Sequence, residues 1–358
     1  MSKHPHSQAF SWQRLTLLIL CVVLALILFV LIFATAYIHH LLSFITPGNN
    51  SIIDGTLSSE QMATATDPDE TYDPTNGTVS TNPSIPEKDI VLETLPSLSP
   101  SELKVDGVIN IMLVGEDRRP DEDRQRSDSM ILCSFDTRNN TINMVSFLRD
   151  AYVAIPGYSA SKMNAAYQWG GVSLLDRTLA VNFGVHVDGN IVVNFEGFMK
   201  IIDMLGGVTI TLTEAEANHL NEIYKFELEP GPQHLTGRQA LCYSRIRYID
   251  WDISRTQRQR NVLTAILNNL RSKDLGSLIS VATDILQSGF IETDMSATEL
   301  MSYITTLFPM VANANVNNQH IPALGTFEEM NVGRLVDVKV ADLEANRKIL
   351  DKIFGRDE

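Results

Sequence analysis

From residue 105 onward, short apolar runs alternate with segments whose apolar positions repeat at the helical period. The apolar runs are bounded by glycine or polar residues and predict buried strands, which lie at 107–115, 129–136, 141–148, 187–194, 207–212 and 317–322. The periodic segments predict helices, which lie at 162–169, 171–182, 195–205, 213–224, 236–246, 254–271, 275–288, 296–307 and 338–354. Strands interleaved with helices indicate an α/β layer fold.

A much longer apolar run lies near the start of the chain. Residues 15–38 contain no charged side chain and are long enough to cross a bilayer as a helix. The run exceeds the apolar part of a signal peptide, and the sequence AYIHHLLSF makes a poor cleavage site. We therefore predict one uncleaved transmembrane helix at 15–38. Lys3 and Arg14 precede it and acidic residues dominate after it, so we expect residues 1–14 in the cytoplasm.

The segment after the predicted span has the composition of a linker. Residues 47–100 hold seven of the 14 prolines with many Ser, Thr, Asn and Asp residues. Their apolar residues repeat neither at the period of a strand nor at that of a helix. We expect residues 39–104 to form a flexible extracellular tether and residues 105–358 to form one folded extracellular domain. The protein would then be a single-pass protein of the cell membrane.

Composition narrows the classes of function. A chain of 358 residues that is 44% hydrophobic buries a full core without disulfides. Its net charge of -15 argues against a protein that coats nucleic acid. The three cysteines, Cys21, Cys133 and Cys242, lie far apart and are expected to be buried thiols. The sequence contains no GxSxG, P-loop, HExxH or GxGxxG motif, which removes the common hydrolase and nucleotide-binding classes.

Charged residues follow the first and third predicted strands. Asp117 lies just past the end of the first strand, while Arg126 and Asp128 lie just before the second, so strand pairing would bring the two aspartates together. Two carboxylates without His or Cys suit a hard cation such as Mg²⁺, although a solvated charged loop would look the same. Arg149 and Asp150 follow the third strand and, taken alone, are typical of a surface ion pair.

The segment YSRIRYIDWDISRTQRQR, residues 243–260, holds five arginines and no lysine. If 254–271 is a helix, one face carries Arg255, Gln259, Val262 and Ile266, so that an apolar stripe begins with two polar groups. Such groups usually point into a cleft, because an unpaired buried guanidinium is costly. An exposed amphipathic helix with a salt-bridge network is the alternative.

Arg245 and Arg247 diverge if they lie in a helix and point the same way if they lie in an extended segment. In either case Asp250 and Asp252 are close enough in sequence to orient these arginines.

Several ordered segments together resemble the LytR-CpsA-Psr family of cell-wall enzymes. They are INIMLVGEDRR, RSDSMILCSFD, VSFLRDAYVAIPG, KMNAAYQWGG, VVNFEGFMKIIDMLGGVTI, GPQHLTGRQALCYSRIRYIDWD and SRTQRQRNVLTAI, and they extend over residues 107–270. The resemblance implies a central mixed β-sheet flanked by helices in an α/β/α arrangement. It also implies a phosphotransferase that moves a glycopolymer, such as teichoic acid or capsular polysaccharide, from an undecaprenyl pyrophosphate or phosphate carrier to peptidoglycan through a phosphodiester.

The same resemblance implies a role for each charged residue. Asp117 and Asp128 would hold Mg²⁺, with Mn²⁺ as the alternative ion. A pyrophosphate would be bound by six side chains, those of Arg126, Arg149, Arg245, Arg247, Arg255 and Gln259. The catalytic residues would be Arg126, Arg149 and Asp252, with Asp252 as a general base or as an orienter of an arginine. The polyprenyl chain would enter an apolar channel between the sheet and the helices.

Two other functions fit the same residues. With water as the acceptor, the site would hydrolyse polyprenyl or nucleotide pyrophosphates. Without catalysis, the protein would be a membrane-attached regulator or scaffold that binds anionic wall polymer through its arginines. Product formation with and without peptidoglycan fragments separates transfer from hydrolysis.

Overall fold

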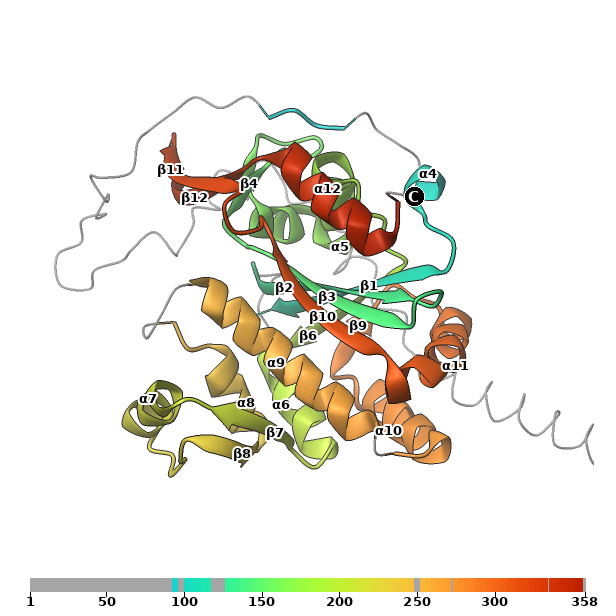
Figure 1. The fold of residues 1–358 in the computed structure, drawn as a ribbon, viewed down its shortest axis with the longest axis vertical. Helices are drawn as coiled ribbons and strands as arrows, with labels where there is room; N and C mark the ends of the chain where they lie inside the picture. The colour runs from blue at the N-terminus through green and yellow to red at the C-terminus, as the bar shows by residue number, and fades with distance from the viewer. Residues whose placement is uncertain are drawn as a thin grey trace, which may run out of the picture. The chain divides into compact units, whose positions relative to one another are not determined.

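The computed structural model describes residues 92–95, 100–116, 126–247, 252–271, 273–333 and 335–356 (Figure 1). The predicted segment 1–14 and span 15–38 lie outside the described residues, as does the predicted tether except for 92–95 and 100–104. Among the helices that the structure describes, none combines the length and the hydrophobicity that a membrane span requires.

A six-stranded sheet forms the centre, with the strand order β10-β3-β2-β1-β6-β9. In chain order the strands are β1 Val108–Glu116, β2 Ser127–Asp136, β3 Thr141–Phe147, β6 Gly189–Asn194, β9 Ile291–Thr293 and β10 Asn315–Ile321. β1 pairs antiparallel with β2 and parallel with β6, so the sheet is mixed. All of these strands except β9 were predicted, with ends that agree within two residues.

Apart from the short helix α4, which lies in the segment predicted as tether, the helices of the described chain follow the predicted order. They are α4 Pro100–Leu103, α5 Met163–Phe183, α6 Phe195–Met204, α7 Glu214–Tyr224, α8 Gly237–Ser244, α9 Asp252–Arg271, α10 Leu275–Ser288, α11 Ala297–Asn313 and α12 Leu343–Phe354. Figure 1 shows α5 and α12 on one side of the central sheet and α9 on the other.

The alternation of side chains along β2 explains this layering. Met130 and Leu132 belong to a core cluster that includes residues of α5 and α12, whereas Ile131 and Cys133 belong to a second cluster with residues of α9 and α11. Successive side chains of a strand point to opposite faces, so an apolar run buries both faces of the sheet. Cys133 and Cys242 are buried free thiols as predicted, and burial raises the pKa of Cys133 to about 12.

The structure has two smaller sheets besides the central one. The strands β4 Ala151–Val153, β5 Ser161–Lys162, β11 Phe327–Val332 and β12 Leu335–Ala341 form a sheet with the order β11-β12-β4-β5. β7 Val208–Leu212 pairs with β8 Gly231–Leu235. Of these strands the sequence predicted only β7.

The helix predicted at 338–354 is wrong in its first part. The residues LVDVKVA at 335–341 alternate apolar and polar positions and form β12, which pairs with β11 and β4. α12 starts only after Asp342, whose Oδ1 accepts a hydrogen bond from the backbone N–H of Ala345 at 2.9 Å. The helix predicted at 296–307 extends to Asn313, past Pro309.

Glycines have a structural role at two places in the helices. Gly170 and Gly171 interrupt α5, and Gly171 has a φ of 66°, which agrees with the two helical segments predicted at 162–169 and 171–182. At the start of α8, a Cβ atom on Gly237 would overlap the backbone of Met199 in α6. Only glycine therefore lets α6 and α8 approach this closely.

Asn190 in β6 links two aspartates, Asp176 in α5 and Asp294 just after β9. The Nδ2 atom of Asn190 donates to Asp176 at 2.9 Å and to Asp294 at 2.8 Å. Burial raises the pKa of Asp176 to about 8, the hydrogen bond from Asn190 opposes this increase, and the charge of Asp294 adds to it. Asp176 therefore keeps its proton at neutral pH.

Candidate functional site

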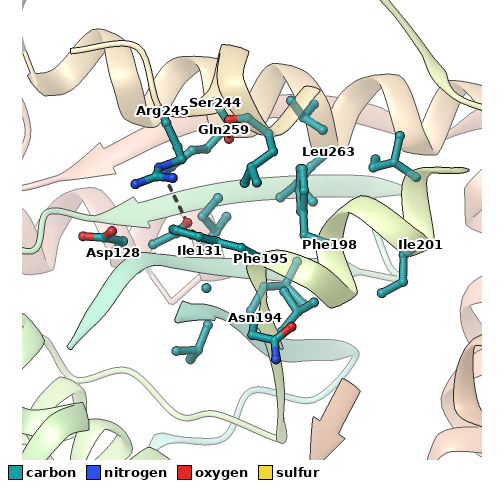
Figure 2. A pocket seen from close by; sticks show the side chains of 18 of the residues that line it. Asp128, Ile131, Asn194, Phe195, Phe198, Ile201, Ser244, Arg245, Gln259 and Leu263 are labelled. Carbon is teal, nitrogen blue, oxygen red and sulfur yellow. Dashed lines mark hydrogen bonds between the residues drawn. The ribbon is translucent and has the colours of Figure 1, made fainter. Parts of the chain in front are cut away.

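A pocket of about 370 Å³ lies between the central sheet and helices α6, α8 and α9. Figure 2 shows the charged side chains of Asp128 and Arg245 at one end and the apolar side chains of Phe198 and Ile201 toward the other. The pocket thus combines a charged end with an apolar body.

Strands and helices both contribute to the apolar body. Its lining consists of Leu113, Val114, Ile131, Ile191, Val193, Phe195, Phe198, Ile201, Ile202, Leu241, Val262, Leu263, Ile266 and Ile291. Transfer of each CH₂ group from water into such surroundings is favourable by about 0.8 kcal/mol. The body is therefore suited to a hydrocarbon chain.

One face of α9 runs along the whole pocket. Arg255, Gln259, Val262 and Ile266 all line it, which confirms the face predicted from their helical spacing. Arg255 is only 3% exposed. The hydroxyl of Ser129 in β2 donates to Oε1 of Gln259 at 3.1 Å, an interaction that the sequence did not suggest. This bond leaves the amide NH₂ of Gln259 available for another acceptor.

The segment after α8 supplies two more arginines. Arg245 and Arg247 lie beyond the last helical residue, Ser244, and both line the pocket. The guanidinium carbon of Arg245 lies 4.3 Å from the ring centroid of Phe195, a distance at which cation–π attraction is effective. Phe195, the first residue of α6, was not predicted as a site residue.

Asp128 receives two guanidinium groups at the charged end. Its Oδ1 atom accepts a hydrogen bond from Nη1 of Arg149 at 3.2 Å and lies 3.7 Å from Nη2 of Arg247. Arg149 therefore reaches the edge of the site through Asp128, although it is not among the residues that line the pocket. Two positive charges beside one carboxylate leave this end well suited to an anion with several oxygens.

Arg149 also lies close to a second carboxylate, that of Asp150. Its Nε atom lies 3.7 Å from Oδ2 of Asp150, whose Oδ1 atom lies 3.3 Å from Nζ of the buried Lys162. Burial favours a higher pKa for Asp150, but the positive charges of Arg149, Lys162 and Lys339 outweigh it and lower the pKa. Asp150 is thus charged and orients Arg149. The two lysines help to keep Asp150 charged, and the sequence analysis did not identify them.

Arg126 lies apart from the pocket lining. Its Nε atom donates to Oε1 of Gln168 in α5 at 3.0 Å. The neighbouring residue Tyr167 donates its hydroxyl hydrogen to Oε2 of Glu116 at 3.1 Å, and Glu116 is fully buried at the end of β1. The sequence did not point to the pair Tyr167–Glu116, because Glu116 stands at the start of a charged segment and was not distinguished from its other charged residues.

Asp128 is the only predicted metal ligand whose side chain the structure describes. Asp117 lies outside the described residues, as does the side chain of Asp252, although α9 begins at that residue. Within the described part of the chain there is no cluster of three or more His, Cys, Asp or Glu side chains that could hold a metal ion. A carboxylate such as that of Asp128 can hold Mg²⁺ where a bound ligand supplies phosphate oxygens, because this ion keeps several waters and takes few protein ligands.

Known proteins match both the sequence and the fold. Regulatory protein MsrR of Staphylococcus aureus is 31% identical over 241 residues, which are 64% of this chain and 69% of MsrR. The polyisoprenyl-teichoic acid–peptidoglycan teichoic acid transferase TagT of Bacillus subtilis is 32% identical over 244 residues, which are 64% of this chain and 74% of TagT.

A solved structure, TagT bound to LIIa-WTA, superimposes with a TM-score of 0.56 at 25% identity and covers 73% of this chain and 94% of that one. The sequence profile of the LytR_cpsA_psr family matches residues 56–352, which extends well beyond the motifs at 107–270. The chain therefore belongs to the LytR_cpsA_psr family.

Proposed function

We propose that this protein is a phosphotransferase that moves an anionic glycopolymer of the teichoic acid or capsule type from an undecaprenyl pyrophosphate carrier to peptidoglycan. One observation carries the proposal: a pocket of about 370 Å³ has an apolar body and an end that holds Arg245, Arg247, Arg255 and Asp128. TagT of Bacillus subtilis, which is named as a teichoic acid transferase, supports the reaction class.

A lipid pyrophosphate matches both halves of this pocket. Its polyprenyl chain would lie among apolar side chains such as Leu263 and Phe198, where burial removes hydrocarbon from water. Its phosphates would meet the arginines and the free amide group of Gln259, which donate hydrogen bonds in fixed directions. The carrier would thus be held with its phosphorus atoms at the charged end.

The reaction breaks one bond and forms one bond at the phosphorus atom next to the glycopolymer. A peptidoglycan hydroxyl attacks that phosphorus, the bond to the bridging oxygen breaks, and polyprenyl phosphate leaves with the bonding electrons. Arg245, Arg247 and Arg255 stabilise the negative charge that grows on the leaving phosphate, which is the main contribution a protein makes to phosphoryl transfer. Asp252 is the candidate for accepting the hydroxyl proton or for orienting an arginine.

Arg149 would act from the rim of the same site, whereas the proposed role of Arg126, which lies apart from the pocket lining, rests on the family resemblance alone. Arg149 is fixed between Asp128 and Asp150, so its guanidinium needs little rearrangement to meet a phosphate oxygen. Mg²⁺, or Mn²⁺ in its place, would be held by Asp128 and Asp117 and would supply further charge neutralisation to the phosphates. The span at 15–38 would place the domain on the outer face of the membrane, where the carrier and the wall meet.

The proposal is tested with the full-length chain in detergent micelles. The chain is incubated with Mg²⁺ and a synthetic polyprenyl-pyrophosphate-linked glycan, with and without peptidoglycan oligomers. Coupling of glycan to peptidoglycan is expected with the wild type and not with Arg149→Ala. Release of polyprenyl phosphate at the same rate without peptidoglycan would indicate a hydrolase. Lipid binding without any product would indicate a scaffold.

A further inference from the structure

A buried ion pair lies next to the arginine end of the pocket without lining it. Nε of Arg258 in α9 donates to Oε1 of Glu216 in α7 at 2.7 Å, and the side chains are only 4% and 9% exposed. Neither residue belongs to the pocket lining. Burying two charges costs free energy unless further hydrogen bonds satisfy the remaining donors and acceptors. The groups that form hydrogen bonds with Glu216 and Arg258 are therefore held in place by this ion pair.

The first partner is the start of α7. Oε2 of Glu216 accepts a hydrogen bond from the backbone N–H of Thr213 at 2.9 Å, and the hydroxyl of Thr213 accepts one from the N–H of Glu216. This reciprocal capping box fixes the carboxylate to a helix end. Glu216 is therefore a rigid support for the guanidinium of Arg258.

The second partner is the backbone between the two pocket arginines. Nη1 of Arg258 donates to the carbonyl oxygen of Ile246 at 3.1 Å. The N–H of Ile246 donates to the carbonyl of Tyr243 at 3.3 Å, and the side chain of Ile246 is buried. Ile246 is thus held through its donor, its acceptor and its side chain, directly beyond the end of α8.

We propose that Arg258, supported by Glu216, is a positioning residue that fixes the segment 245–247 so that its two arginines face the lipid pyrophosphate. The inference rests on the proposed function. Both Arg245 and Arg247 line the pocket, and the position of Ile246 between them decides where each side chain starts. Arginine suits this role because its planar fork donates in two directions at once, to the carboxylate and to the carbonyl.

The test compares Arg258→Met with Arg138→Met in the full-length chain. Arg138 is a control with the same kinds of partner in a more exposed place, because its side chain is 40% exposed and its Nη2 atom contacts a carboxylate, Asp136 at 2.9 Å, and the backbone carbonyl of Phe354 at 3.0 Å. Backbone hydrogen exchange in 243–247 and the affinity for inorganic pyrophosphate with Mg²⁺ are measured. Arg258→Met is expected to speed exchange there and to weaken the affinity on the order of 10- to 100-fold, the loss that follows when a charged hydrogen bond to the ligand is no longer made. Arg138→Met is expected to change neither.

A double-mutant cycle with Arg247→Ala separates positioning from general damage. If Arg258 acts through the pocket arginines, Arg258→Met costs less affinity when Arg247 is already absent than it costs in the wild type. Equal losses in both backgrounds, or unchanged affinity in Arg258→Met, would overturn the positioning role alone. A wild type that binds no pyrophosphate would instead overturn the proposed function and this role with it. If Arg258→Met does not fold, Glu216→Gln carries the same expectations, since glutamine preserves the capping box.

Discussion

Replacing Phe195 with leucine tests how the charged end of the pocket is built. The change removes the aromatic face that lies 4.3 Å from the guanidinium carbon of Arg245 and keeps an apolar side chain. Arg245 is exposed, so the lower range of cation–π energies applies, about 0.5–1 kcal/mol. This predicts a loss of affinity for a polyprenyl pyrophosphate of about 2- to 5-fold beyond the effect of lost apolar area.

Phe198→Leu is the matched control for that prediction. Phe198 lies in the same helix, is half-buried and lines the same pocket, but within the described residues no arginine lies over its ring. Both full-length variants are titrated in detergent with a polyprenyl pyrophosphate and with the uncharged polyprenol of equal length. The polyprenol reports the apolar contribution of each ring separately from any effect on phosphate.

The expected pattern is specific to one variant and one ligand. Phe195→Leu should lose additional affinity only for the pyrophosphate, whereas Phe198→Leu should lose the same amount for both lipids. For each variant, the loss of affinity for the pyrophosphate is divided by the loss of affinity for the polyprenol. If this ratio is the same for both variants, the reasoning is refuted, because Phe195 then contributes apolar area and does not orient Arg245.

Three further changes have defined outcomes. Arg149→Ala should lower the initial rate of glycan coupling by about 1,000-fold, as loss of a phosphate-stabilising arginine does, and a reduction below tenfold would contradict its role. Chelation of divalent cations should stop coupling in the same assay and added Mg²⁺ should restore it; unchanged coupling would remove the metal from the account. Asp176→Asn should alter the pH dependence of the melting temperature. The pKa of Asp176 is raised from 3.8 to about 8 in the folded chain, so its contribution to stability is complete below about pH 4 and is lost as the pH rises to about 8. Between about pH 4 and about pH 8 the free energy of unfolding of the wild type should therefore fall by several kcal/mol relative to that of the variant. A difference in unfolding free energy that stays constant with pH would show that Asp176 is not protonated in the folded state.

The parts of the site that follow a local period could be predicted from sequence. Arg255, Gln259, Val262 and Ile266 recur at helical spacing, and helix geometry alone then places them on one face. The central strands were equally predictable, because both of their faces are buried and their sequences are almost continuously apolar.

The missed elements depend on partners that are distant in sequence. β12 has only a short alternating pattern, and its strand conformation is stabilised by pairing with β11 and β4. In the site, Phe195 lies under Arg245 and Lys162 beside Asp150 because the fold brings separate elements together. No spacing rule along the chain connects such residues, so only the three-dimensional structure shows them.

The role of Arg258 illustrates the same limit within the arginine-rich segment. Helical spacing separated Arg255, which leads the apolar face of α9, from the other arginines of 243–260, but it gave no partners for Arg258 and Arg260. The structure shows where these two guanidinium groups are held. Arg258 contacts Glu216 and Ile246, and Arg260 donates to Ser146 of β3, so neither guanidinium is directed to the pocket.

In the proposed reaction, a lipid pyrophosphate is cleaved by transfer of its glycan phosphate to peptidoglycan. Mass spectrometry can follow polyprenyl phosphate and glycan-linked peptidoglycan together in one reaction of the full-length chain with Mg²⁺. If transfer occurs, both products form in equal amounts and the coupled product retains a single phosphate between glycan and peptidoglycan. Polyprenyl phosphate released in excess, together with free glycan phosphate, would contradict transfer and establish hydrolysis.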